Sequence, residues 1–289
     1  MARMTRRTAL GTAAAAAAAA LSARQASAGD QTGKAVVKGR LKQSVSRWCY
    51  GKIPMPEFCK AVAAMGLTAI DLLEEKEWSI VRDFGLICSM GYAGGGTIPD
   101  GLNVRANHDA IVKNFEEKIP IAAKLQVPNV ITFFGNRRGM PDAEAIDNCI
   151  AGLNRVKKIG EDHDVTICVE LLNSKVDHKD YQGDHTAFGV QIVKAVNSPR
   201  VKLLYDAYHM QIMEGDLIRT MRDNKEWIAH VHTGGVPGRQ CNSARYGHQS
   251  RWHHRTVPAD VVEPVPRDPS RARRGVLRYS QLSDRHGRA

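Results

Sequence analysis

The chain has 289 residues, of which 43% are hydrophobic, so it is long enough to bury the core of one large domain or two small ones. Its formal net charge of +11 would suit a nucleic-acid partner, but the positive charge lies at the two ends of the chain. Residues 1–28 contain four arginines and no acidic residue, and residues 240–289 contain ten arginines and four acidic residues, so residues 29–239 are nearly neutral. This placement excludes a nucleic-acid-binding function inferred from charge.

Residues 1–28 have the three parts of a twin-arginine export signal. Arg6 and Arg7 form the arginine pair, an alanine-rich stretch of modest hydrophobicity follows, and the small residues at 26–28 offer a site for a signal peptidase. We therefore expect a mature chain outside the cytoplasm, periplasmic or exported, that begins with a flexible lead over residues 29–39. The alanine-rich stretch is too weakly apolar for a stable membrane anchor. The alternative interpretation is an alanine-rich helix with no targeting function.

Residues 40–239 alternate between short apolar runs and amphipathic stretches. The apolar runs predict strands, which cover residues 41–50, 67–73, 86–93, 127–136, 165–173, 201–210 and 228–236. The amphipathic stretches predict helices, which cover residues 54–66, 107–126, 142–163, 185–197 and 215–224. Pro120 lies inside the second of these helices, and we expect it to kink or divide that helix.

This alternation predicts a parallel sheet covered by helices, because the strands are apolar along nearly their whole length. An open doubly wound sheet and a closed (β/α)8 TIM barrel both satisfy the pattern. No G-x-G-x-x-G motif follows the first strand and no G-x-x-x-x-G-K-[ST] motif occurs, which disfavours a nucleotide-binding sheet. None of the six cysteines belongs to a C-x-x-C pair, so neither a zinc knuckle nor a dithiol motif is indicated. We therefore expect an α/β fold of the TIM-barrel type.

Polar side chains end three consecutive predicted strands. Glu170 and Asp206 each follow an apolar run, and His230 and His232 lie on the same face of the last run because side chains alternate along a strand. A carboxylate that closes a buried strand needs a cationic partner. Two carboxylates and an imidazole suit Mg²⁺ or Mn²⁺. Taken singly, each residue is equally well explained as a helix cap, a salt-bridge partner or a satisfied core histidine.

Three sequence words carry a closer resemblance. They are VELLNSKVDHKDYQGDHTAFGV, SPRVKLLYDAYHMQIMEGD and HVHTGGVPGR, and they resemble the hydroxypyruvate isomerase family within the xylose isomerase-like TIM-barrel superfamily. The resemblance covers about residues 39–239. It implies a (β/α)8 barrel with a divalent metal, Mg²⁺ or Mn²⁺, at its mouth. In that family the ligands are a Glu after strand five, an Asp after strand six, a His or Gln on strand seven and a Glu on strand eight.

Matching those words to this chain implies a set of site residues. The implied metal ligands are Glu170, Asp206 and His232, and His230 is left with a packing or supporting role. The implied substrate-binding residues are His209 and Arg239. Glu170 is also the implied catalytic carboxylate, and the second base would come from strand eight.

The resemblance implies an aldose–ketose type of isomerisation on a small sugar or keto-acid substrate. Hydroxypyruvate and tartronate semialdehyde would interconvert through an ene-diolate, with the metal acting as a Lewis acid. Carboxylates would take and return the proton that moves between adjacent carbons. Arg239 would bind the substrate carboxylate through a two-pronged contact.

Residues 240–289 depart from the family. They contain no lysine and are rich in arginine and proline, without an amphipathic helix or an apolar strand, so we expect a disordered tail and a barrel that lacks a normal eighth strand. The strand-eight Glu is missing, and Glu263, the one acidic residue of the tail with apolar neighbours, is crowded by prolines and is a poor substitute. The composition indicates a frameshift just after Arg239, and the chain is expected to bind metal weakly and to have little or no activity.

Other functions remain compatible with the sequence. A sugar epimerase would use the same barrel, metal and carboxylates, and a non-catalytic exported binding protein would keep three ligands without the second base. A basic tail that binds nucleic acid would leave the barrel open, so we expect no nucleic-acid partner. The sequence leaves homo-oligomerisation open.

The frameshift hypothesis predicts a specific result from the nucleotide sequence of the gene. One of the two other reading frames downstream of codon 239 should encode an amphipathic helix and a final strand with a Glu-Phe word. Sequencing this part of the gene checks the prediction. If both other frames lack such a strand, the hypothesis is wrong.

Overall fold

We describe the chain from a computed structural model, in which residues 41–239 are described in full and residues 276–278 by their backbone. The predicted export signal at 1–28 and the predicted lead at 29–39 lie outside the described residues. So does the remainder of the tail, at 240–275 and 279–289, which includes Glu263. Within the described residues, no helix has the length and apolar character that crossing a membrane requires.

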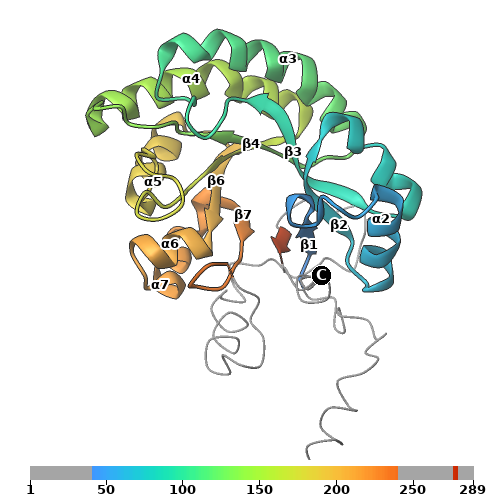
Figure 1. Cartoon of the computed structure of the whole chain (residues 1–289). Coiled ribbons are helices and arrows are strands. Elements are labelled where there is room, and N and C mark those ends of the chain that lie inside the picture. The colour runs from blue at the N-terminus through green and yellow to red at the C-terminus, as the bar shows by residue number, and fades with distance from the viewer. Residues whose placement is uncertain (1–40, 240–275, 279–289) are drawn as a thin grey trace, which may run out of the picture. The chain divides into compact units, whose positions relative to one another are not determined.

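The sheet is a parallel barrel in which each strand pairs with the next one along the chain (Figure 1). Its strands are β1 (Gln43–Ser46), β2 (Ala69–Glu74), β3 (Ile87–Gly95), β4 (Asn129–Phe133), β5 (Thr166–Glu170), β6 (Val201–Asp206), β7 (Ile228–His232) and β8 (Val276–Arg278). The TIM-barrel architecture predicted from the sequence is therefore confirmed, and the alternative of an open doubly wound sheet is wrong.

Within the described part of the chain, the barrel has no full eighth strand, as predicted. The closing strand β8 has three residues, and it pairs with β7 on one side and β1 on the other through two residue pairs each. Figure 1 shows it as the short red arrow between these strands. The expectation that the tail contains no strand at all is wrong in this detail. A three-residue segment is too short to show an alternating pattern in the sequence, and only its pairing with two neighbours defines it.

Helices lie on the outside of the strands (Figure 1). The α-helices are α2 (Met55–Ala64), α3 (His108–Lys124), α4 (Asp142–His163), α5 (Thr186–Val196), α6 (Ala207–Met213) and α7 (Leu217–Asp223). Short 3-10 helices complete the connections, namely η1 (Arg47–Tyr50), η2 (Glu75–Glu77), η3 (Ile80–Phe84), η4 (Arg105–Asn107) and η5 (Lys225–Trp227). Two of them, η2 and η3, replace the helix that would normally join β2 to β3.

Three predicted elements differ in the structure, and the predicted strand over residues 201–210 is one of them, because it is divided into strand β6 and helix α6. Helix α3 runs through Pro120 without being divided. Proline has no backbone N–H to donate to the carbonyl of Glu116, four residues earlier. Glu116 is exposed, so water can donate a hydrogen bond to that carbonyl instead. The predicted first strand stops at Ser46 and continues as the 3-10 helix η1.

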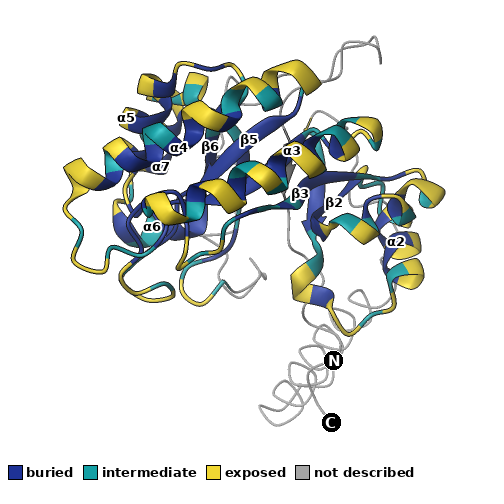
Figure 2. Ribbon diagram, turned by 90° about the horizontal axis from the view of Figure 1, so that it is seen from above, coloured by how far each residue is buried: buried dark blue, intermediate teal, exposed yellow. Residues whose placement is uncertain are grey.

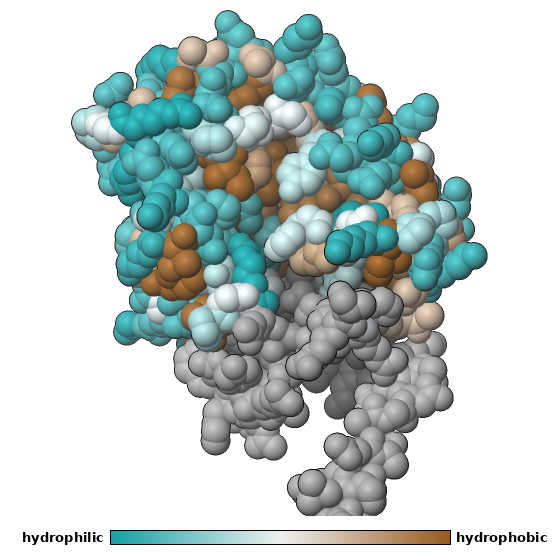
Figure 3. All heavy atoms as spheres, in the orientation of Figure 1, coloured by the Kyte–Doolittle hydropathy of each residue, from teal (hydrophilic) through white to brown (hydrophobic). Residues whose placement is uncertain are grey.

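Burial follows the alternation of strands and helices. Strands β2, β3, β5 and β6 are buried along nearly their whole length, and the helices expose one face and bury the other (Figure 2). The face of the molecule seen in Figure 3 is largely hydrophilic with scattered apolar residues. The large apolar side chains that are exposed among the described residues are Leu41, Trp48, Ile121 and Val176.

The core contains a close contact between Gly91 of β3 and Trp78, which follows β2, and this contact predicts the effect of a substitution. Gly91 leaves room for the indole of Trp78, and a Cβ at Gly91 would lie 2.5 Å from Cζ2 of that ring. Trp78 is fully buried and its Nε1 donates to the carbonyl of Leu73 at 3.0 Å, so the ring has little freedom to move. Gly91→Ala should lower the free energy of unfolding by about 1–3 kcal/mol, measured by urea denaturation.

Gly51→Ala is the matched control. The nearest atom to a Cβ at Gly51 is a backbone oxygen 4.0 Å away, and its φ of −54° suits alanine. This variant should unfold at the urea concentration of the parent chain. Equal midpoints for the two variants would contradict the packing argument.

Candidate metal centre

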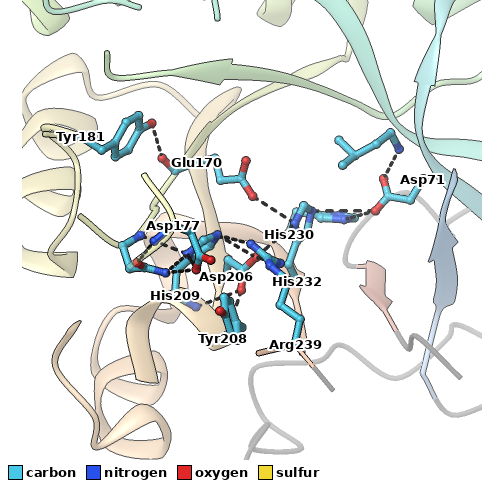
Figure 4. A network of polar contacts seen from close by, with 12 residues as sticks. Asp71, Glu170, Asp177, Tyr181, Asp206, Tyr208, His209, His230, His232 and Arg239 are labelled. Carbon is cyan, nitrogen blue, oxygen red and sulfur yellow. Dashed lines mark hydrogen bonds and ion pairs between the residues drawn. The ribbon is translucent and has the colours of Figure 1, made fainter. Parts of the chain in front are cut away.

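Three neighbouring strands deliver one polar side chain each to a single point. Glu170, Asp206 and His232 are the last residues of β5, β6 and β7, and Asp206 pairs directly with His232 across the sheet. The carboxyl ends of parallel strands meet at the same end of a barrel, so the three side chains converge (Figure 4). Their ligand atoms all lie within 4.8 Å of one another, and all three residues are buried. The sequence had placed these residues at strand ends, and the structure brings them together.

His232 lies between the two carboxylates. Its Nδ1 is 3.1 Å from Oε1 of Glu170 and 3.7 Å from Oδ2 of Asp206. Burial disfavours the imidazolium, but the two carboxylates outweigh burial and raise the pKa of His232 above its ordinary value. In the absence of a metal ion, the protonated form of the ring is therefore favoured, and its positive charge offsets the negative charge of the carboxylates.

Asp206 accepts several further interactions. Its Oδ1 accepts hydrogen bonds from the backbone N–H groups of Tyr208 and His209, at 2.8 and 3.2 Å, and so caps helix α6. Burial alone would raise the pKa of this carboxyl, but its cationic and hydrogen-bonding neighbours, with His209 first among them, hold the pKa well below the usual range. The helix-cap role considered for this residue therefore coexists with its place in the cluster, because the two oxygens face different groups.

The donor set fits a hard divalent cation. Two ionised carboxylates and one imidazole offer the oxygen-rich ligand set typical of Mg²⁺ or Mn²⁺ sites. The other ring nitrogen of His232, Nε2, is buried and has no hydrogen-bond partner among the described residues. A cation that displaced the proton from Nδ1 would leave the remaining ring proton on this nitrogen.

His209 and Arg239 lie beside the cluster. The backbone N–H of Asn173 donates to Nδ1 of His209 at 3.1 Å, which makes Nδ1 an acceptor and places the proton of the neutral ring on Nε2. Nη2 of Arg239 contacts that same Nε2, and Nη1 of Arg239 is 3.5 Å from Oδ2 of Asp206. The guanidinium also stacks 4.3 Å from the ring centre of Tyr208. Two hydrogen-bond donors therefore meet at one point next to the carboxylate cluster.

Sequence reasoning missed several residues that support this site. Tyr181 donates its hydroxyl proton to the carbonyl of Glu170 at 2.8 Å and accepts from the backbone N–H of Phe134 at 2.9 Å, so it ties β5 to β4 at the site. Asp71, on β2, is fully buried, and its Oδ2 lies 3.0 Å from Nε2 of His230. The one signal for Asp71 is an isolated acidic residue inside an apolar strand, and no sequence pattern singles out Tyr181.

Comparison with known proteins identifies the fold and a group of relatives. The sequence profile of a family described as xylose isomerase-like TIM barrel matches residues 59–260. The chain is 27% identical over 176 residues to a D-psicose 3-epimerase of Agrobacterium fabrum, covering 55% of this chain and 57% of that one. It is 30% identical over 100 residues to a hydroxypyruvate isomerase of Escherichia coli, covering 34% of this chain and 36% of that one.

The solved structures agree with the fold. An AP endonuclease of family 2 from Brucella melitensis superposes with a TM-score of 0.65 at 18% identity, covering 82% of this chain and 92% of that one. The chain spans between about a quarter and just over half of the length of the first curated relatives it matches. The broad resemblance predicted from the sequence is therefore confirmed, whereas the matches include both isomerases and epimerases and leave the narrower subfamily to be argued from the site.

The raised pKa of His232 predicts how the stability of the metal-free chain depends on pH. The folded ring binds a proton more tightly than the unfolded ring, whose pKa is about 6.5, so this interaction is fully present below that pH and is lost as the pH rises through the folded pKa. The other shifted histidines, His178, His209 and His230, have lowered pKa values and act at lower pH. In EDTA, urea midpoints should therefore fall as the pH rises above about 6.5.

Two variants separate this effect from general pH dependence. His232→Ala should remove the fall above pH 6.5, although it also destabilises the chain by leaving two buried carboxylates without their cation. His163→Ala removes an exposed histidine at the end of α4 and should leave the fall unchanged. A fall that persists in His232→Ala would show that another group titrates.

Proposed function

The chain belongs to the xylose isomerase-like TIM-barrel family. We propose that it derives from a divalent-metal-dependent isomerase of small keto acids such as hydroxypyruvate. The observation that carries this proposal is the buried cluster of Glu170, Asp206 and His232. These residues would hold Mg²⁺ or Mn²⁺, which when bound would act as a Lewis acid towards an ene-diolate. The relatives named hydroxypyruvate isomerase and D-psicose 3-epimerase support a reaction that moves a proton at a carbon next to a carbonyl.

The residues of the chain would divide the work of proton transfer and binding. Glu170 would take the proton from the hydroxymethyl carbon of hydroxypyruvate, because a carboxylate at the barrel mouth is a suitable general base. The hydrogen bond from Tyr181 to the backbone carbonyl of Glu170 would keep that carboxylate in place. Burial of the cluster strengthens each of these electrostatic contacts, because little water competes for them.

The substrate carboxylate would lie between His209 and Arg239. The Nε2–H of His209 and the guanidinium of Arg239 are both donors in direct contact, and Oδ2 of Asp206 lies 3.7 Å from Nε2 of His209 and 3.5 Å from Nη1 of Arg239. A substrate oxygen placed there would accept from both groups and relieve their unfavourable contact. This arrangement favours a carboxylated substrate over a neutral sugar.

The second base is the part that the described chain does not supply. The three residues of β8 are Val276, Leu277 and Arg278, and none of them is acidic. Proton return to the neighbouring carbon needs a carboxylate on the other face of the substrate, which the family places on strand eight. We therefore propose that the 289-residue chain has little or no isomerase activity, in keeping with a frameshift after Arg239.

A sugar epimerase is the second candidate, and the relatives named D-psicose 3-epimerase favour it. An epimerase would need room for a neutral polyol where the carboxylate would bind. It would therefore tolerate loss of the positive charge at Arg239 better than an isomerase of a keto acid would. A non-catalytic exported binding protein is the third candidate, and the site would then bind metal and ligand without turnover.

Restoration of the eighth strand tests the proposal. The sequence after Arg239 is replaced by the translation of the alternative reading frame, and conversion of hydroxypyruvate is followed by NMR with Mn²⁺ or Mg²⁺. The restored chain should convert hydroxypyruvate and the 289-residue chain should not.

In the restored chain, Glu170→Gln should lower kcat by about 100-fold or more, because it removes general-base catalysis. Chelation with EDTA should abolish turnover reversibly.

Asp109→Asn is the control for this variant, because Asp109 is an exposed residue of α3 whose partner is Arg155. Its kcat should match that of the restored chain. Full activity of Glu170→Gln would contradict the proposed base. Turnover of D-psicose but not of hydroxypyruvate would favour the epimerase, and metal binding without turnover of either would favour the binding protein.

A further inference from the structure

We propose that Asp71 is a positioning residue that fixes the ring of His232, so that Nδ1 faces the metal position and Nε2 keeps the ring proton. This inference rests on the proposed metal site and adds a residue from the opposite side of the barrel. Asp71 lies on β2, whereas the three proposed ligands come from β5, β6 and β7. Figure 4 shows Asp71 on the far side of the two histidines from Glu170.

The ring of His232 lies between two sets of carboxylates. Its Nδ1 faces Glu170 and Asp206, at 3.1 and 3.7 Å. Its Nε2, on the other side of the ring, is 4.0 Å from Oδ2 of Asp71 and has no hydrogen-bond partner among the described residues. A shift of about 1 Å would bring Nε2 and this carboxylate to hydrogen-bonding distance.

An imidazole that ligates a metal through one nitrogen must carry its proton on the other. If Nδ1 ligates a cation, Nε2–H is the donor that remains, and Asp71 is the acceptor that faces it. A carboxylate in this position fixes the tautomer and the orientation of the ring and makes the ligating nitrogen more basic. The full burial of Asp71 strengthens the interaction, because water does not compete for the carboxylate.

His230 restricts the ring from the side. Its Nε2 lies 3.0 Å from Oδ2 of Asp71, and its ring stands edge-on to that of His232, with the two centres 5.4 Å apart. The same carboxylate oxygen therefore faces both histidines of β7. Rotation of the His232 ring about its Cβ–Cγ bond is therefore limited by the ring of His230, which its contact with Asp71 holds in place.

The backbone around Asp71 is irregular. The pairing of β2 with β3 is irregular on both sides of Asp71, and the next residue, Leu72, has a φ of 57°. A left-handed conformation is unfavourable for leucine, because its Cβ approaches the following carbonyl oxygen. The backbone N–H of Leu72 donates to Oδ1 of Asp71 at 3.0 Å, which leaves Oδ2 directed at the histidines. Such bulges next to active sites re-aim a side chain, and strain of this kind gathers at functional positions.

The cluster of Asp71, His230 and His232 also has the residue types and spacing of a cation site. Two cations would then share His232, which would have to lose both ring protons. We favour a single cation, because one proton on Nε2 and one ligating nitrogen satisfy the ring without that loss. The number of metal ions bound by the chain distinguishes the two arrangements.

Metal titration tests the role of Asp71. The full 289-residue chain is titrated with Mn²⁺, and the free ion is measured by electron paramagnetic resonance. The unsubstituted chain, which lacks the strand-eight ligand, should bind one equivalent weakly, and Asp71→Asn should raise the Kd by about 10- to 100-fold while the circular dichroism spectrum stays that of a folded chain. Asp184→Asn is the matched control, because Asp184 is a buried carboxylate paired with Arg137 and should leave the Kd unchanged.

The tautomer of His232 provides a second measurement that needs no variant of Asp71. Long-range ¹H–¹⁵N spectra of the histidine-labelled chain with Zn²⁺, compared with those of His232→Gln to identify the ring, should show the metal on Nδ1 and the proton on Nε2. Metal on Nε2, two bound equivalents, or an unchanged Kd in Asp71→Asn would each overturn the role of Asp71 and leave the proposed metal site intact. Absence of metal binding by the unsubstituted chain would overturn both.

Discussion

The structure is organised around the need to neutralise two carboxylates that the barrel buries at neighbouring strand ends. Glu170 and Asp206 lie at the carboxyl ends of β5 and β6, where the fold brings them within a few ångströms of each other. Two such charges without a cation would destabilise the fold. His232 provides the positive charge from the next strand when its ring is protonated, and a divalent ion would provide it otherwise. The same constraint explains why the site is built from strands, which hold these groups rigidly, rather than from loops.

The surrounding groups satisfy the remaining polar atoms of this cluster. Asp206 accepts from two backbone N–H groups of α6, and the Tyr181 hydroxyl joins the backbone of Glu170 to that of Phe134. Asn173 sets the tautomer of His209 from the loop after β5. Each of these contacts joins two elements, so the loops after β4, β5 and β6 are held in register with the strands that carry the charged residues. Where His209 meets Arg239, two donors face each other, and the carboxylate oxygen beside them, Oδ2 of Asp206, lies 3.7 Å from Nε2 of His209 and 3.5 Å from Nη1 of Arg239.

The sequence predicted the part of this arrangement that follows from strand periodicity. Glu170 and Asp206 stand out because each closes an apolar run, and parallel strands bring such ends to the same edge of the barrel. The pattern placed His230 and His232 together on the last run, and only the family resemblance singled out His232. Asp71 could not be found in this way, because it lies in the middle of its strand, where the pairing with β3 is irregular and the alternation of side chains is no guide. The start of α6 at Ala207 was missed because the apolar pattern continues through residues 201–210, and the change from strand to helix depends on the cap made by Asp206. The contact of Asp71 with β7 joins residues far apart in the sequence. The cap of α6 is local, but a side chain makes it, and the apolar pattern does not reveal it.

Closure of the barrel and completion of the site place different demands on the tail. Closure needs only backbone groups, and the three residues of β8 supply them by pairing with His230 and Val231 of β7 and with Gln43 and Ser44 of β1. A short extended segment without proline can meet that demand, because its ladder hydrogen bonds come from the backbone N–H and C=O groups. The proposed isomerisation would need a carboxylate at the end of that strand, which is a demand on one side chain. A chain read in the wrong frame can therefore keep most of the barrel and three proposed ligands, while it loses the group that would return the proton.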